Sequence, residues 1–180
     1  MAELRRRDAL PAGSPRRPRF QNRDYYFRPG LTYSVVSSGR VSARLMPEGW
    51  IFGHKGSAIF VEDGEAPELF LLEYLNSALA TYFMKKLVNT TATADVGYVE
   101  KLPYRRPGPE LELGVVSRVE RMVEALRADP DADIARLREV IDELIFDLFE
   151  LRSTRDEIQR FYRSAGKVEA DAYDDQAASE

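Results

Sequence analysis

Alternating apolar and polar residues in the first third of the chain predict paired β-strands. Residues 41–46 read VSARLM, so the first, third and fifth share an apolar face and Arg44 lies on the opposite face. Residues 31–36, LTYSVV, supply a candidate partner strand. The intervening SSGR, residues 37–40, has the composition of a tight turn in which Gly39 can adopt a positive φ. The pattern therefore predicts a β-hairpin.

Turn residues and short apolar runs continue this β-rich segment. Residues 47–49, PEG, form a second predicted turn, and residues 50–52 and 58–61 are predicted as further short strands. Gly53 and Gly56 interrupt the pattern between these two strands, as at a bulge or a close backbone approach.

From Pro67 onward the apolar residues are spaced by three and four, which predicts a helix. Proline suits the first turn of a helix, and the spacing continues to about Leu87. The following residues 89–109 are polar, small and closed by proline, so we expect a loop that holds one short strand at most.

Strict helical spacing returns in the C-terminal part of the chain. Apolar residues over 116–126 predict one helix, and the Asp-Pro at residues 129–130 predicts the start of the next, because proline is tolerated there. An apolar seam at spacings of three and four follows, formed by Ile134, Leu137, Ile141, Leu144, Leu148 and Leu151. Two such helices joined by a short loop predict an antiparallel hairpin.

These patterns predict an α+β fold, in which a small β-rich domain with a packed helix is followed by an antiparallel helical hairpin. Residues 1–19 are expected to be a disordered basic lead-in, and residues 20–108 the β-rich domain. Residues 109–166 should form the hairpin with a capping last helix, and residues 167–180 a disordered acidic tail.

The composition excludes several kinds of chemistry. The chain has no cysteine, which excludes disulfides and thiolate metal sites, and a single histidine, His54, which removes most histidine-based relays. No apolar run approaches the roughly 20 residues of a membrane-spanning helix, and the arginine-rich N-terminus lacks the apolar core of a signal peptide. We therefore expect a cytoplasmic protein without membrane contact.

The net charge of −4 hides two halves of opposite sign. Residues 1–106 hold 16 basic and 11 acidic residues, whereas residues 107–180 hold 10 basic and 19 acidic residues. Only the first half carries the sign expected for a polyanionic partner.

Residues 53–57, GHKGS, do not match a phosphate-binding loop. That loop needs a longer glycine spacing and the order Gly-Lys-Ser/Thr leading into a helix, whereas here the order is Lys-Gly-Ser and a strand is predicted next. His54 has no second histidine or cysteine to support base catalysis, and the nearby acidic residues form no recognisable acid–base pair. We therefore expect no catalytic, cofactor-binding or metal-binding residue in this chain.

Basic side chains interleaved with aromatic and hydroxyl groups are the remaining functional signal, because arginine forks can bind guanine edges and hydroxyls can hold phosphates. The candidate DNA contacts are Arg28, Tyr33, Ser37, Ser38, Arg40, Arg44, His54 and Lys55. Arg44 is expected to project from its strand toward base edges, and Arg40, at the hairpin tip, to enter a groove or hold a phosphate. The alternative is a solvated sheet surface in which Arg44 pairs with a buried acid such as Asp24 or Glu62.

Two stretches resemble the specificity region of adenine-specific DNA methyltransferases of the TaqI-like and BREX (phage-growth-limitation) type. The first is YYFRPGLTYSVVSSGRVSARLMPEGWIFGHKGSAIF, residues 25–60, and the second is LLEYLNSALATYFMKKLVNTTATADVGYVEKLPY, residues 71–104. In the second, a helix carrying Leu-Asn-Ser at residues 75–77 is followed by a loop, Gly97 and a closing Leu-Pro at residues 102–103.

The resemblance covers about residues 20–164, because IDELIFDLFELRSTRDEI, residues 141–158, resembles the tail of the same proteins. It implies that residues 20–108 are the target-recognition domain of an adenine-N6 DNA methyltransferase from a bacterial restriction-modification or phage-defence system. In that family the specificity region grips double-stranded DNA while the methyltransferase domain flips out an adenine, which S-adenosylmethionine then methylates.

The sequence departs from the family at the catalytic parts. It holds no Asn/Asp-Pro-Pro-Tyr/Phe motif, and no glycine-rich turn follows a strand and opens a helix. The family's catalytic and cofactor-binding residues therefore carry over to no position here, and we expect no methyl transfer from this chain alone. The resemblance then implies a separate recognition subunit or part of a split gene, with S-adenosylmethionine bound by a partner methyltransferase domain or subunit.

A protein-interaction adaptor built on residues 110–151 is the rival interpretation, because an apolar helical seam can capture a partner or a second copy of the chain. Its predicted partner interface comprises Leu137, Ile141, Leu144 and Leu148. An intramolecular hairpin would use the same residues without a partner. A truncated remnant with no independent DNA binding is a third alternative.

Overall fold

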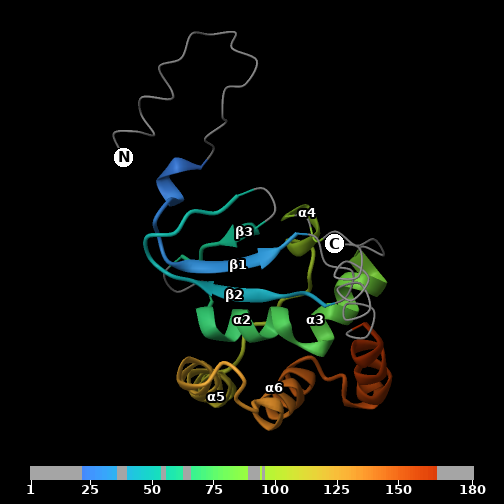
Figure 1. The fold of residues 1–180 in the computed structure, drawn as a ribbon. Coiled ribbons are helices and arrows are strands. Elements are labelled where there is room, and N and C mark those ends of the chain that lie inside the picture. The colour runs from blue at the N-terminus through green and yellow to red at the C-terminus, as the bar shows by residue number, and fades with distance from the viewer. Residues whose placement is uncertain are drawn as a thin grey trace, which may run out of the picture.

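A small antiparallel sheet and a set of helices make up the fold, which confirms the predicted α+β class. The computed structural model describes residues 22–35, 40–53, 56–62, 66–88, 94 and 96–165. The elements are η1 (Arg23–Tyr25), β1 (Gly30–Ser34), β2 (Ala43–Met46), β3 (Gly56–Ile59), α2 (Glu68–Asn76), α3 (Ala78–Phe83), η2 (Met84–Val88), α4 (Val96–Val99), α5 (Pro109–Ala128), α6 (Ala135–Leu148), η3 (Arg152–Thr154) and a last helix over residues 155–165. Helices α2 and α3 lie between the sheet and the pair α5 and α6 (Figure 1). No helix within the described ranges is long and apolar enough to cross a membrane.

Strand β1 occupies the centre of the three-stranded sheet, with β2 and β3 antiparallel on either side. Leu31 lies opposite Leu45 and is fully buried, so this face of the sheet turns toward the core. Thr32 lies opposite Arg44 on the other face. The predicted pairing of the two strands is therefore confirmed, while residues 37–39 of the predicted turn lie outside the described part of the chain.

The strand predicted at residues 50–52 does not form. Trp50 is exposed there, and its carbonyl accepts a hydrogen bond from the Phe27 N–H at 2.9 Å, so the backbone pairs with the segment before β1. Strand β3 begins at Gly56, two residues earlier than predicted. The predicted turn before Trp50 is confirmed, and Gly49 adopts the left-handed φ of 88° that favours glycine.

The helix predicted from Pro67 to Leu87 is broken at Ser77, which has an extended backbone (φ −69°, ψ 158°). The Ser77 hydroxyl donates to the Tyr74 carbonyl at 2.6 Å and accepts from the Ala80 N–H at 3.1 Å. The same side chain therefore ends α2 and caps α3. Apolar spacing did not reveal the break because both short helices present their apolar residues to one core.

Two further boundaries differ from the predicted ones. The short helix α4 forms in the segment that was expected to hold at most a strand. Helix α6 begins at Ala135, not at Pro130, because the intervening aspartates form turns. The Asp129 carboxylate accepts from the Asp131 N–H at 3.0 Å, and the Asp133 carboxylate accepts from the Ala135 N–H at 2.9 Å.

Asn76, the last residue of α2, binds the backbone of the edge strand β2. Its Oδ1 accepts from the Ala43 N–H at 2.8 Å, and its Nδ2 donates to the Ala43 carbonyl at 3.0 Å. Two residues earlier on the same edge, the Val41 N–H donates at 3.4 Å to Oγ1 of the fully buried Thr81. The edge of a sheet leaves such groups unpaired, so these side chains satisfy the edge and fix it to α2 and α3.

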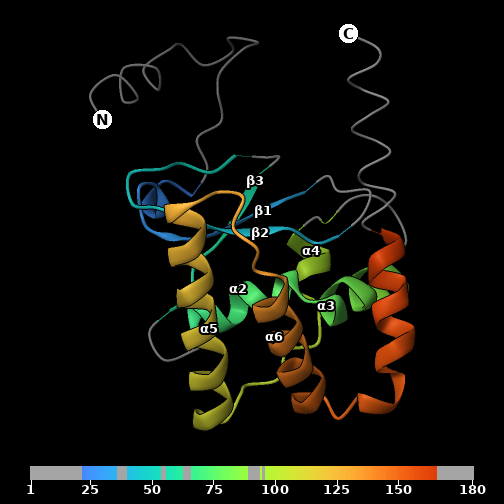
Figure 2. The same cartoon turned by 60° about the horizontal axis from the view of Figure 1, so that its bottom comes forward.

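Helices α5 and α6 lie side by side and run in opposite directions, as Figure 2 shows, so the predicted antiparallel hairpin is confirmed. Helix α5 packs on α2, and α6 packs on α3. One core cluster runs from Leu31 in the sheet to Ile158 in the last helix. The segments predicted as residues 20–108 and 109–166 therefore share a core.

The apolar seam of α6 faces this core. Ile141 is 1% exposed, and Leu137, Leu144 and Leu148 are partly buried against the core cluster. The residues predicted as a partner interface thus make an intramolecular contact, and a side chain as buried as Ile141 presents no surface to a second chain.

Replacing Asn76 with Ala should lower the free energy of unfolding by about 1–3 kcal/mol, because both polar groups of Ala43 lose their partner. Alanine is the better helix former, so an unchanged or raised stability in urea unfolding would contradict this role. Asn76→Asp is the matched variant. It should also be destabilised at neutral pH and recover part of the loss in acid, where a protonated carboxyl can again donate to the Ala43 carbonyl.

Replacing Ile141 with Ala should lower the free energy of unfolding by about 2–5 kcal/mol, because it opens a cavity in the core. The half-buried neighbour Val140 is the control, and Val140→Ala should cost about 1 kcal/mol or less. Sedimentation should give the same mass for both variants and for the wild type. A reduced mass with unchanged stability would instead identify the seam as an intermolecular contact.

Candidate nucleic-acid interface

A pocket of about 270 Å³ opens where the β2 segment meets α6 and the last helix. Residues from four separate parts of the chain line this arginine pocket: Arg40, Val41, Ser42, Ala43, Arg44, Asn76, Arg138 and Tyr162. Among the residues that the structure describes, the lining includes three arginines and no acidic side chain. In a chain whose net charge is −4, the pocket is a local concentration of positive charge.

Arg44 projects from β2 on the exposed face of the sheet, as predicted. Its Nη2 donates to the Ser34 hydroxyl on the neighbouring strand at 2.6 Å. Glu62, one of the acids considered as its partner, lies 3.8 Å from Arg28 instead. The contact with Ser34 holds the Arg44 guanidinium in place without neutralising its charge.

Arg40 lies over the ring of Tyr162, with its guanidinium carbon 4.2 Å from the ring centroid. Its Nε is 3.5 Å from the Tyr162 carbonyl oxygen, and the Tyr162 hydroxyl donates to the Asn76 carbonyl at 3.3 Å. Burial raises the pKa of the Tyr162 phenol, and attraction to Arg40 only partly opposes this, so the hydroxyl keeps its proton at neutral pH. The tyrosine therefore connects Arg40 to the end of α2.

Arg138 reaches the pocket from α6 and lies near two carboxyl groups. Glu73, on α2, is 6% exposed, and Asp142 lies one turn after Arg138 on α6. Burial raises the pKa of the Glu73 carboxyl, attraction to Arg138 lowers it, repulsion by Asp142 raises it, and a hydrogen bond with the Asn76 side chain lowers it. The positive charge of Arg138, which lines the pocket, therefore favours the ionised form of the buried Glu73.

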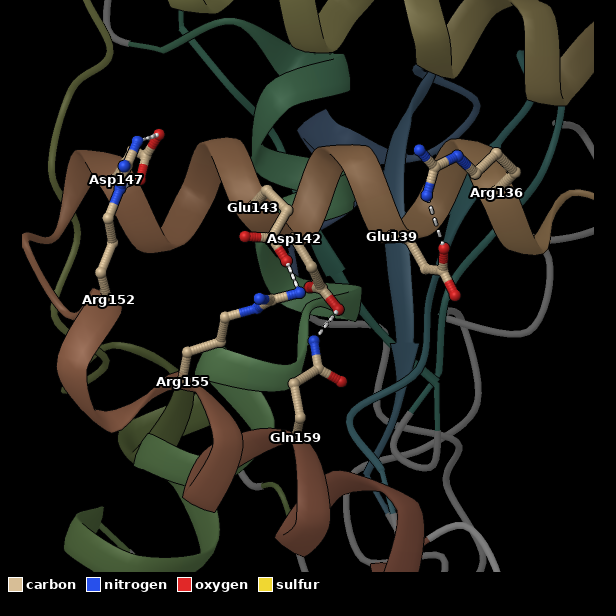
Figure 3. A network of polar contacts seen from close by, with 8 residues as sticks. All are labelled: Arg136, Glu139, Asp142, Glu143, Asp147, Arg152, Arg155 and Gln159. Atoms are coloured by element: carbon tan, nitrogen blue, oxygen red, sulfur yellow. Dashed lines mark hydrogen bonds and ion pairs between the residues drawn. The ribbon is translucent and has the colours of Figure 1, made fainter.

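Asp142 joins α6 to α3 and to the last helix. Its Oδ1 accepts from the Ala78 N–H at 3.1 Å, and its Oδ2 accepts from Gln159 Nε2 at 3.2 Å (Figure 3). Burial raises the pKa of the Asp142 carboxyl, and these two hydrogen bonds oppose that rise. Two further ion pairs tie η3 and the last helix to α6, Arg152–Asp147 and Arg155–Glu143. This network fixes the helix that carries Tyr162.

Two of the other predicted DNA contacts, Arg28 and Tyr33, do not line the arginine pocket. Arg28 lies 5.1 Å from the centroid of the Tyr25 ring and 5.5 Å from that of the Phe60 ring, in an aromatic group near the start of β1. Tyr33 is 2% exposed, because strand alternation places it on the core face of β1, so it has no surface with which to contact DNA. The remaining candidates lie outside the described residues: Ser37, Ser38, His54 and Lys55.

The connection between β3 and α2 is where a cofactor-binding turn between a strand and a helix would be expected. Strand β3 leads into α2 through residues 60–67, which hold a single glycine, whereas a dinucleotide-type cofactor turn needs a glycine-rich loop between a strand and a helix. Within the ranges described above, no group of three or more histidine or acidic side chains could hold a metal ion.

Sequence reasoning missed Arg138 and Tyr162. Arg138 lies outside the apolar seam of α6, where an arginine has the pattern of an ordinary solvated residue. Tyr162 lies in the last helix, far from the β-hairpin in sequence. Asn76 was inside the Leu-Asn-Ser stretch of the resemblance, and that was the one signal that pointed to this part of the fold.

Two curated proteins are similar to part of this chain. The adenine-specific methyltransferase PglX of Lacticaseibacillus casei (strain Zhang) is 34% identical over 109 residues, which are 60% of this chain and 9% of that protein. The adenine-specific methyltransferase BrxX of Escherichia coli O9:H4 (strain HS) is 36% identical over 84 residues, which are 46% of this chain and 7% of that protein.

The match spans less than a tenth of the length of either relative. No family model matches the chain. The chain therefore contains a region related to adenine-specific methyltransferases of the BREX type.

Replacing Glu73 with Gln should stabilise the protein relative to wild type as the pH rises. Because the folded-state pKa of Glu73 is raised, its favourable contribution is fully present below the unfolded-state pKa and is lost as the pH rises through the folded-state pKa. Glutamine cannot ionise, so the difference in free energy of unfolding should shift toward the variant as the pH rises from about 4, the ordinary pKa of a glutamate carboxyl.

Urea unfolding across this range measures that difference. The exposed Glu120→Gln on α5 controls for the loss of one negative charge and should show a smaller change with pH. A difference for Glu73→Gln that stays flat, or that moves toward the wild type, would contradict the burial of an ionising carboxyl at this position.

Proposed function

We propose that this chain is a DNA target-recognition module of an adenine-N6 DNA methyltransferase that acts in phage defence or restriction-modification. The observation that carries the proposal is the similarity of part of the chain to PglX and BrxX, both of which are named adenine-specific methyltransferases. An enzyme that methylates adenine at chosen sites must grip duplex DNA while the base is turned out of the stack.

The distribution of charge supports the proposal. The polar face of the sheet carries Arg44 beside Ser34, and the adjoining pocket adds Arg40 and Arg138. Phosphate contacts by such side chains supply a large share of protein–DNA affinity. The more acidic C-terminal half presents its apolar seam inward, so the seam packs within the fold.

The chemistry of methyl transfer belongs to another part of the enzyme. In this proposal the cofactor and the catalytic groups are supplied by a methyltransferase domain or subunit. This chain then contributes DNA binding and choice of site, and double-stranded DNA and the methyltransferase are its two partners.

Duplex binding by the full chain, measured by fluorescence anisotropy across a salt series, tests the proposal. The logarithm of the binding constant should fall linearly with the logarithm of salt concentration between about 50 and 200 mM, because each neutralised phosphate releases counterions. Selection from a random duplex pool should enrich one adenine-containing sequence. A folded sample that fails to bind at low salt would refute the proposal.

Arg44→Ala should weaken duplex binding by about 1–3 kcal/mol, since it removes a charged hydrogen-bonding fork from the exposed face of the sheet. Arg121→Ala removes the same charge from an exposed position on α5 and should have a much smaller effect. Equal effects of the two variants would show that the sheet face is not where DNA binds.

A further inference from the structure

We infer that the arginine pocket holds one backbone phosphate of the bound DNA, gripped jointly by Arg40, Arg44 and Arg138. This inference rests on the proposed function and deepens it. It also changes the role of Arg44, which the sequence suggested as a reader of base edges. In the pocket, Arg44 positions the duplex and carries no sequence information by itself.

The pocket matches the chemistry of a phosphodiester group. A phosphate offers only acceptor oxygens, and an arginine offers only donors arranged as a fork that binds such oxygens bidentately. Three forks line one pocket of about 270 Å³. Base edges present both donors and acceptors, so a lining of arginines suits phosphate better than it suits a base.

Each arginine is positioned from a different direction. Arg44 is held by the Ser34 hydroxyl at 2.6 Å, and Arg40 by the face of Tyr162 at 4.2 Å. Arg138 lines the pocket from α6. Fixing side chains before binding reduces the conformational entropy that binding must remove.

Asn76 and Tyr162 complete the pocket without competing for the ligand. The Asn76 amide is already bonded on both its oxygen and its nitrogen to Ala43, and the Tyr162 hydroxyl donates to the Asn76 carbonyl. Both groups line the pocket with these hydrogen bonds already made. Arg138 brings the helical part of the chain into the same DNA contact as the sheet.

The test compares Arg138→Gln with Arg136→Gln in the duplex-binding assay. Arg136 lies two residues earlier on α6, pairs with Glu139 at 3.1 Å and has a side chain that is 86% exposed, so it controls for the loss of one positive charge (Figure 3). Arg138→Gln should weaken binding about tenfold. It should also reduce the salt slope by about one, with the same enriched sequence as wild type. Arg136→Gln should change neither quantity by as much.

Arg44→Gln and the double variant Arg44→Gln/Arg138→Gln test whether the two arginines act on the same phosphate. Circular dichroism and thermal melts check that each variant is folded. If both arginines hold one phosphate, the double variant should lose less affinity than the sum of the two single losses. Additive losses, or an Arg44→Gln variant with altered sequence preference, would overturn the shared phosphate site.

Titration with inorganic phosphate tests whether the pocket binds a free phosphate ion as well as a phosphate of the DNA backbone. Phosphate should bind weakly to the wild type, compete with DNA and lose its binding in Arg138→Gln. If the wild type binds DNA but Arg138→Gln binds with unchanged affinity and slope, the inference fails and the proposed function stands, whether or not phosphate binds. If the folded wild type binds no duplex at low salt, both fail.

Discussion

Most of this structure depends on the two hydrogen bonds between the side-chain amide of Asn76 and the backbone of Ala43. Asn76 satisfies the outward-facing N–H and carbonyl of Ala43 at 2.8 and 3.0 Å, so the edge of a three-stranded sheet becomes an internal boundary of the fold. A sheet of this size has little face to bury and two edges to protect. The contact with α2 protects one edge of the sheet. It also buries one face, because α2 packs on the sheet and on α5.

The break at Ser77 follows from the same constraint. After the extended backbone at Ser77, α3 presents the Thr81 hydroxyl to the Val41 N–H. Asp142 from α6 then binds the first N–H of α3, which couples the helical hairpin to the break. Desolvation disfavours the ionised forms of the buried Glu73 and Asp142 carboxyls, and attraction to Arg138 partly offsets this for both. The arginine pocket is therefore built on the junction that holds the layers together.

The stretches through which the chain resembles DNA methyltransferases act, in this structure, as packing devices. Leu-Asn-Ser ends one helix and begins the next. In the closing Leu-Pro, Leu102 is 8% exposed, and the Pro103 carbonyl accepts a hydrogen bond from the hydroxyl of Tyr74, whose ring stacks on Phe149. In this chain, these residues therefore serve the packing of the fold. Function must be carried by the surface that this architecture presents, where charge and exposure, not the motif, decide what binds.

The sequence by itself determined the elements whose periodicity is local: the hairpin strands, the turn at Gly49 and the amphipathic helices of the C-terminal half. It also determined the face on which Arg44 lies, because alternation along a strand is fixed by backbone geometry. Only the tertiary structure decided that the apolar seam is internal, that Tyr33 is buried, and that Arg40, Arg44 and Arg138 meet. The physical reason is that a pattern of residues specifies which face of an element is apolar, whereas the partner of that face depends on contacts between residues distant in sequence. The salt bridges, helix caps and edge pairings that bring distant arginines together produce no periodic pattern in the sequence.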